Sequence, residues 1–281
     1  MLLKWRFALL MLIQTMAFGL FDKQPIIDHD SSKWIFDAYG WALQNFDADL
    51  FYSDTVLVHP TNEFFPGSVN SVQGMAELIF DRIKGYAGIK HWPTRVQDQS
   101  LCVAIESQQI QIQGALRGPG GITDESVEDN QRLVIPYNPQ QISNPEGMIA
   151  SYAHILSHYM GRMAKAEPPG GIDSWPQATE LLAIYLGFGF MFANSAYNFR
   201  GGCGSCYNPH AQRDAYLSET EATYALALFC QLKGIPNSKV TPHLKTHLRG
   251  IYRKSVKDIS DRVEEVDHLR SYAVVSSVPK L

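Results

Sequence analysis

The sequence predicts an α+β fold, because helical patterns occupy both ends of the chain and strand-like patterns gather between them. Apolar residues recur at helical spacing over residues 31–46 and 71–88, and again beyond residue 143. The stretches that alternate or run apolar at strand length are residues 101–106, 108–114 and 132–137. We expect three or four strands in a mixed or antiparallel sheet, packed on a mainly helical C-terminal half.

Local signals mark the elements of the first part. Ser31 and Ser32 are candidate caps of the first helix. The apolar stretch Thr55–Val58 has the length of a short strand and leads into a proline-bounded turn. The second helix is expected to end near Gly85 or Gly88, because glycine commonly terminates helices.

Helical signals follow one another through the second part. Asn144 can cap a helix, Pro145 suits its first position and Gly161 marks its end. Ser218 and Glu221 have the spacing of a capping box, which predicts the start of a later helix.

The remaining helices are predicted from their apolar content. Residues 177–197 are nearly apolar enough to span a membrane, but Glu180 and Asn194 favour a buried core helix. We therefore expect no integral membrane domain. A last long helix is expected from about Pro242 to Val266, and residues 271–281 are interpreted as a loosely held tail.

The length of 281 residues, with 45% hydrophobic and 19% charged residues, suits one sizeable domain. We expect an N-terminal segment at residues 1–30, a single domain at 31–266 and a tail at 267–281. Within the domain, helices and sheet are expected over residues 31–142 and the helical half over 143–266.

Charge and composition exclude some classes of function. The net charge is −4, and no basic stretch is interleaved with aromatic residues, which argues against nucleic-acid binding. The segment MLLKWR followed by FALLMLI has the pattern of a short export signal. A start codon assigned too early, with Met11 or Met16 as the true start, is the alternative. We expect a cytoplasmic protein, with export through this segment as the alternative.

Two histidines, His154 and His158, stand four residues apart in an apolar helical run, the spacing of the zinc-peptidase motif H-E-x-x-H. Residues four apart share one helix face, so both imidazoles can point at one zinc ion. A zinc site needs at least one further protein ligand. Glu180, on the next predicted helix, is the first candidate, and Asp173 in the preceding loop is the second.

The spacing alone is weak evidence, because the chain has a second pair with the same spacing. His243 and His247 lie at the start of a basic helix with no apolar wall nearby, and we interpret them as surface residues. By spacing alone, the core is the better-supported role for His154 and His158.

Longer stretches around the first pair carry a more specific pattern. They read VLVHPTNEFFPG, LIFDRIKGYAGIKHWP, RLVIPY with a GGIT loop before it, YAHILSHYMG, TELLAIYLGFGFMFANSAYNF and YLSETEATYALALFCQLKG. Together, over roughly residues 34–257, they resemble a bacterial family of uncharacterised zincin-like (HExxH metallopeptidase-like) proteins. The resemblance implies a zincin-like fold with His154, His158 and Glu180 as zinc ligands, and a strand at Arg132–Tyr137 beside the helix of the pair.

The chain departs from this family at Ile155, where the motif has its glutamate. In a working zincin that glutamate takes a proton from zinc-bound water, which isoleucine cannot do. The nearest other carboxylates, Glu167 and Asp173, lack the required helical placement. The resemblance thus implies a metal-binding pseudoenzyme with impaired or absent peptidase activity. The alternatives are an active zinc-dependent metallohydrolase with an unusual general base, and a non-enzymatic binding or scaffold protein with core histidines. The sequence identifies no partner, although a peptide or a protein would suit each alternative.

The cysteines raise a separate question. Cys203 and Cys206 form a C-x-x-C pair in a glycine-rich loop. The functional interpretation is a disulfide or a second, structural metal site completed by His210 or Cys230. A redox dithiol and free thiols in a turn are the alternatives. Cys102 falls in a strand pattern and is expected to be a small core residue.

Overall fold

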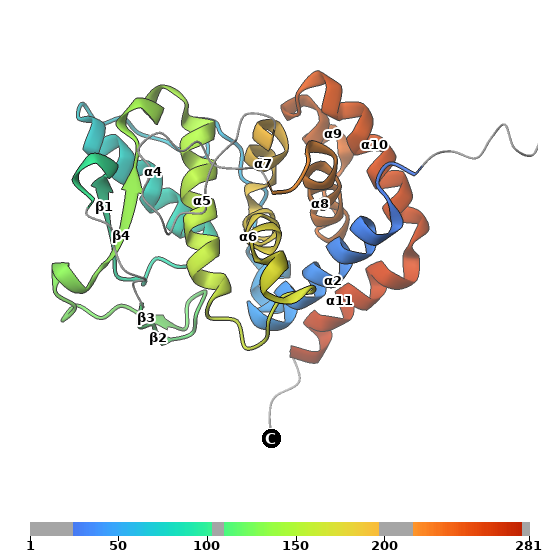
Figure 1. Cartoon of the computed structure of the whole chain (residues 1–281), viewed down its shortest axis with the longest axis horizontal. Helices are drawn as coiled ribbons and strands as arrows, with labels where there is room; N and C mark the ends of the chain where they lie inside the picture. Colours follow the sequence, from blue (N-terminus) through green and yellow to red (C-terminus); the bar gives the residue numbers. More distant parts are fainter. Residues whose placement is uncertain (1–24, 103–109, 197–215, 277–281) are drawn as a thin grey trace, which may run out of the picture.

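The computed structural model describes residues 25–102, 110–196 and 216–276, and these ranges form an α+β fold (Figure 1). The helices are α2 (His29–Asn45), α3 (Ala48–Ser53), α4 (Val72–Ala87), α5 (Pro145–Gly161), α6 (Trp175–Ala183), α7 (Gly189–Ser195), α8 (Glu219–Leu232), α9 (Asn237–Val240), α10 (Thr246–Asp261) and α11 (Val263–Ser276). The strands are β1 (Thr94–Asp98), β2 (Gln113–Gly114), β3 (Gly121–Ile122) and β4 (Leu133–Tyr137). The predicted α+β class is confirmed.

The strands of the described ranges form two small sheets rather than the single sheet that was expected. Strands β1 and β4 pair in parallel, and β2 and β3 pair antiparallel. The prediction located β4 and the end of β2 but missed β1, whose five residues are all half-buried and show no alternation. Of the predicted strand at 101–106, residues 103–106 lie outside the described ranges, and Leu101 ends a 3-10 turn, η1 (Gln99–Leu101).

Three helix ends fall where the sequence predicts them, whereas α2 begins at His29 and is capped by Asp28 instead of Ser31 or Ser32. The Asn144 side chain accepts a hydrogen bond from the Gly147 amide, and α5 then runs from Pro145 to Gly161. The capping box at the start of α8 is formed by Ser218 and its partner three residues on, as expected. Helix α4 ends at Ala87 and is capped by Gly88, whose φ of 74° suits glycine. These boundaries depend on neighbours in the sequence.

The apolar stretch 177–197 is not one continuous helix, which corrects the prediction. Its described part is divided into α6, a π-helical turn η5 (Ile184–Phe188) and α7, with Gly187 at a φ of 100°. A Cβ at Gly187 would clash with the carbonyl oxygen of Val56. The Val58 amide donates to the Gly187 carbonyl at 2.9 Å. The expected strand Thr55–Val58 is therefore an irregular segment whose Val58 amide bonds to a helix break instead of to a strand.

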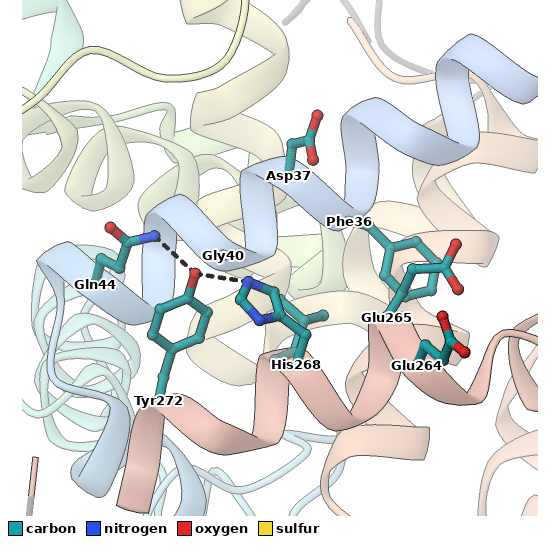
Figure 2. Close-up of a pocket in the computed structure, with 9 residues that line it drawn as sticks. Phe36, Asp37, Gly40, Gln44, Glu264, Glu265, His268 and Tyr272 are labelled. Carbon is teal, nitrogen blue, oxygen red and sulfur yellow. Dashed lines mark hydrogen bonds between the residues drawn. The ribbon is translucent and has the colours of Figure 1, made fainter. Parts of the chain in front are cut away.

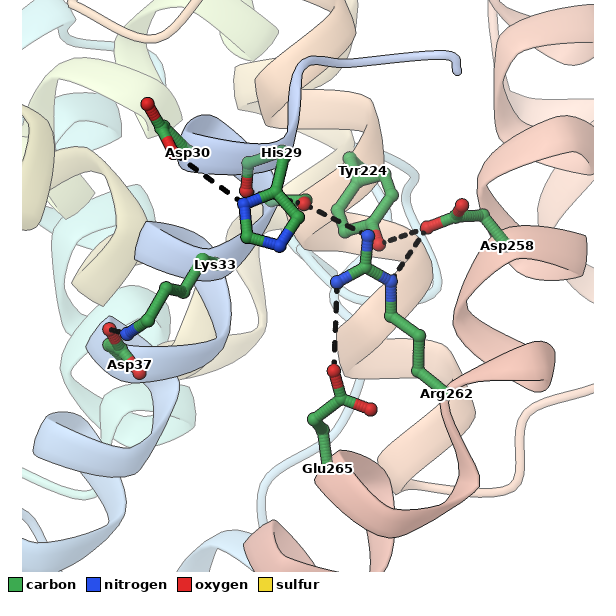
Figure 3. Close-up of polar contacts among 9 residues, drawn as sticks. His29, Asp30, Lys33, Asp37, Tyr224, Asp258, Arg262 and Glu265 are labelled. Atoms are coloured by element: carbon green, nitrogen blue, oxygen red, sulfur yellow. Dashed lines mark hydrogen bonds and ion pairs between the residues drawn. The ribbon is translucent and has the colours of Figure 1, made fainter. Parts of the chain in front are cut away.

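The predicted helix from Pro242 to Val266 is also divided. Helix α10 begins at Thr246 and ends at Asp261, and α11 follows after Arg262. The Arg262 guanidinium bonds to Asp258 at 3.1 Å and to Ser32 of α2 at 3.0 Å, and Tyr224 of α8 donates to the same carboxylate (Figure 3). This network fixes the corner between α10 and α11 against two other helices.

Helix α11 covers a segment that was expected to be a loose tail. It reaches Ser276, and its Leu269 is buried. The Leu269 carbonyl accepts from Tyr52 at 3.0 Å, and the Tyr272 hydroxyl accepts from Gln44 at the same distance. The chain from residue 271 to 276 is therefore helical, and contacts with α2 and α3 hold α11 in place.

Helix α5 lies in the middle of the molecule. Figure 1 shows it between the β1–β4 sheet with α4 on one side and α6 on the other. The buried apolar residues form one cluster that includes side chains from α2, α4, β4, α5, α6, α7, α8, α10 and α11. The two histidines of interest therefore sit on a helix that both parts of the molecule pack against.

Candidate functional site

Helix α5 carries both histidines in one unbroken stretch. His154 is 8% exposed and His158 is half-buried. Both lie in a 17-residue helix, His154 in its interior and His158 in its last turn. The start of the helix is capped, and its last turn is closed by the Arg162 and Met163 amides. Because the helix is continuous, the two imidazoles project from the same face, one turn apart. The prediction that both histidines share one helix face requires a continuous helix, and α5 is continuous.

Glu180 lies on α6, which packs against α5, and is only 2% exposed. Its Oε2 atom accepts hydrogen bonds from the backbone amides of Leu217 at 2.9 Å and Tyr216 at 3.2 Å. These amides directly precede Ser218, the cap of α8. Hydrogen bonds to a charged acceptor are stronger than neutral ones. Glu180 therefore fixes the entry of the chain into α8.

The three predicted ligands do not form a closed metal site in this arrangement. Across residues 25–102, 110–196 and 216–276, no three His, Cys, Asp or Glu side chains stand close enough together to hold one metal ion. The structure thus brings His154 and His158 to one helix face and Glu180 to the adjacent helix. The second candidate, Asp173, is exposed in the 3-10 turn η4 (Gly171–Ser174).

The position at which the family resemblance places a general base is apolar in structure as well as in sequence. Ile155 is half-buried and packs against the core cluster. Glu167, one of the two carboxylates considered as a substitute, is exposed in the loop after α5. The side chain beside His154 therefore offers packing and no proton acceptor.

The electrostatics of His158 favour a neutral imidazole. Burial lowers the pKa of His158 from its ordinary value of 6.5, and the positive charge of Arg162 lowers it further. At neutral pH the ring therefore has an available lone pair, which is the form that binds a metal ion.

The cysteine predictions fall mostly outside the described ranges. Cys203, Cys206 and His210 all lie between residues 197 and 215. Cys230 is buried on α8 as a free thiol, and burial raises its pKa to about 12. Cys102 follows the turn η1 and is half-buried, which corrects its predicted place in a strand of the core.

A pocket between α2 and α11 was missed by the sequence interpretation. It has a volume of about 380 Å³ and is lined by Asp37, Glu264, Glu265 and His268, with Tyr272 bonded to His268 at 3.2 Å (Figure 2). Two of the acids already have partners, because Asp37 pairs with Lys33 and Glu265 with Arg262. No sequence pattern could reveal this pocket, because its lining residues come from opposite ends of the chain.

Within the described ranges, every helix is too short or too polar to cross a bilayer. Comparisons with protein-family models, with curated proteins and with solved structures each give no match.

Proposed function

We propose that the chain is a zincin-like protein that has lost peptidase activity and retains only part of a metal site. Ile155 carries this proposal. The residue after the first histidine of the pair is where a zincin holds its general base, and here it is a half-buried apolar side chain. Loss of a general base removes a factor of about 10²–10⁴ in rate.

The arrangement around α5 supports the zincin-like part of the proposal. Strand β4 lies beside α5, as the resemblance implies for Arg132–Tyr137. On its other side, α5 packs against α6, the helix of the predicted third ligand (Figure 1). The capped, continuous helix keeps His154 and His158 in register on one face.

A complete three-ligand zinc site does not fit the residues as they lie. Glu180 already accepts two backbone hydrogen bonds at the start of α8, and the described ranges hold no three-residue metal group. The proposal therefore limits the metal site to the histidine pair, and it assigns no hydrolytic step to the metal. The neutral imidazole of His158 supports the pair as ligands.

A second candidate function is a non-enzymatic binding or scaffold protein whose histidines serve the core. One observation favours it: His154 and Glu180 are both buried within the helical half, and Glu180 has a structural task. The two candidates differ in whether the pair binds a metal ion.

A peptidase assay tests the loss of activity. Wild type and Ile155→Glu are incubated with a broad peptide library, with added zinc and with a chelator as control. We expect cleavage by neither protein, because Glu180 is committed to the α8 entry. Chelator-sensitive cleavage by wild type that disappears in His154→Ala would show an active metallohydrolase and refute the proposal.

Calorimetric titration with Zn²⁺ separates the two candidates. We expect wild type to bind about one ion per chain with low affinity, because two histidines leave the zinc site incomplete. Binding should be lost in His154→Ala and in His158→Ala. The matched control is His247→Ala, which alters the exposed pair and should bind like wild type. Equal zinc binding by all four proteins, or by none, would favour the scaffold function.

A further inference from the structure

A second feature of the site lies beyond the histidine pair, where α5 ends and α6 begins. An open pocket of about 570 Å³ occupies this place, and it is unrelated to the pocket of Figure 2. The side chains that give it its chemical character are His158, Arg162, Lys165, Glu167, Ile172 and Trp175. The pocket therefore joins the predicted metal-site helix to the loop that follows it.

The loop wall of this pocket is held in place from α2. The indole nitrogens of Trp41 and Trp34 each donate at 2.8 Å, to the carbonyls of Ala166 and Pro169 respectively. The Lys165 amide donates to the Asn45 side chain at 2.9 Å. Three hydrogen bonds within five residues tie this wall to α2, which favours a pocket that is formed before any ligand arrives.

The polar side of the pocket favours a negative charge. Arg162 and Lys165 both line it, and neither forms an ion pair within residues 25–102, 110–196 and 216–276. Glu167 is the one acid among the lining residues. The first residue of α6, Trp175, also lines the pocket, so the positive end of that helix lies at its wall.

The other side of the pocket is apolar and exposed. Ile172 is 74% exposed, which is unusual for a large aliphatic side chain. The half-buried Trp175 lines the same pocket, with its indole packed edge-on against Trp41. Exposed apolar surface beside two cations without ion pairs suits a ligand that is anionic at one end and apolar at the other.

We propose that this pocket binds an organic carboxylate that carries an apolar chain. The carboxylate lies at Arg162 and Lys165, and the apolar chain covers Ile172 and Trp175. A guanidinium matches a carboxylate with two parallel hydrogen bonds. A phosphate dianion fits less well, because Glu167 would repel its second charge. The inference goes beyond the proposed function and holds whether or not the histidine pair binds metal.

Binding is tested with the full chain and four probes: acetyl-Leu-Leu with a free carboxylate, its C-terminal amide, hexanoate and inorganic phosphate. Calorimetry gives the affinities, and the fluorescence of Trp175, assigned with Trp175→Phe, reports occupancy. We expect the free acid to bind at least about tenfold more tightly than the amide, the loss expected for a charge-assisted hydrogen bond. If hexanoate binds as tightly as acetyl-Leu-Leu, the ligand is a small carboxylic acid. If acetyl-Leu-Leu binds and hexanoate does not, the ligand is the C-terminus of a peptide.

Variants then assign the contacts. Arg162→Gln should lower the affinity for the free acid at least about tenfold and leave the affinity for the amide unchanged. Ile172→Ser should lower the affinities for the acid and for the amide by the same factor. The matched control is Arg253→Gln, an exposed arginine on α10. Circular dichroism checks that each variant is folded. Equal affinity for acid and amide, tighter binding of phosphate, no effect of Arg162→Gln, or no binding of either carboxylate at millimolar concentration would overturn the proposal.

Discussion

The two histidine pairs have the same spacing in sequence and different structures. His154 and His158 belong to one continuous helix, α5. His243 ends the short turn η7 (Thr241–His243), whereas His247 lies in α10, and Leu244 and Lys245 between them are extended. The second pair therefore does not share a helix face. An i,i+4 spacing predicts paired ligands only where capping and packing keep the helix unbroken.

The pairs also differ in the glutamate beside them. Glu180, near the first pair, is buried and bonded to two backbone amides of another segment. Glu219, beside the second pair, forms a surface ion pair with His247 at 3.1 Å, and His247 is 56% exposed. A buried carboxylate contributes to stability through its hydrogen bonds, while an exposed ion pair contributes little.

The largest expected effect comes from the buried glutamate. Glu180→Ala leaves the amides of Tyr216 and Leu217 without their acceptor, so we expect the free energy of unfolding to fall by about 2–4 kcal/mol. Urea denaturation measures it. Glu180→Gln keeps one acceptor oxygen and should therefore lose less stability than Glu180→Ala. Glu219→Gln should change the free energy of unfolding by under about 0.5 kcal/mol. Similar losses for Glu180→Ala and Glu219→Gln would remove the difference between the two regions.

The histidines themselves give the next largest effect. His154→Ala removes a buried ring from the core side of α5, and we expect it to cost about 1–3 kcal/mol of unfolding free energy. His247→Ala removes an exposed ring and should cost under about 0.5 kcal/mol. The same urea titrations, run without added metal, measure both. If His154→Ala is as mild as His247→Ala, the first pair contributes no more to the fold than the second.

How far the sequence predicts the molecule depends on the range of the interactions involved. The bounds of α5 follow from Asn144, Pro145 and Gly161, all of which act within one turn. The helix break at Gly187 depends on the backbone of Val56, more than a hundred residues earlier in the chain. The local apolar pattern therefore does not predict it. The two corrections to the long helices both have such distant causes.

The candidate site follows the same rule. The shared face of His154 and His158 is a local property, so the spacing predicts it. The acceptor role of Glu180 involves backbone amides 36 and 37 residues away, and an amide has no sequence signature. The pocket beyond α5 could not be predicted either, since its loop wall is held by Trp34 and Trp41 of α2.

The smallest expected effect concerns the contact of the second pair with the loop before α4. The His243 ring packs edge-on against His59 with centroids 4.3 Å apart, and His59 also stacks on Phe64. Burial lowers the pKa of His59 below 6.5, the nearby His243 lowers it further, and Glu63 opposes the change. The folded protein therefore takes up this proton at lower pH than the unfolded chain does. The stability contributed by neutral His59 is complete above pH 6.5 and decreases as the pH falls through that value.

The substitution His59→Gln removes this dependence. Urea denaturation of both proteins at several values between about pH 8 and pH 5 should show wild type losing stability more steeply than the variant as the pH falls. His243→Gln should make the wild-type slope shallower, because it removes the second cause of the shift. Parallel curves for wild type and His59→Gln would mean that His59 titrates alike in the folded and unfolded chain. The contact between His243 and His59 would then make no pH-dependent contribution to stability.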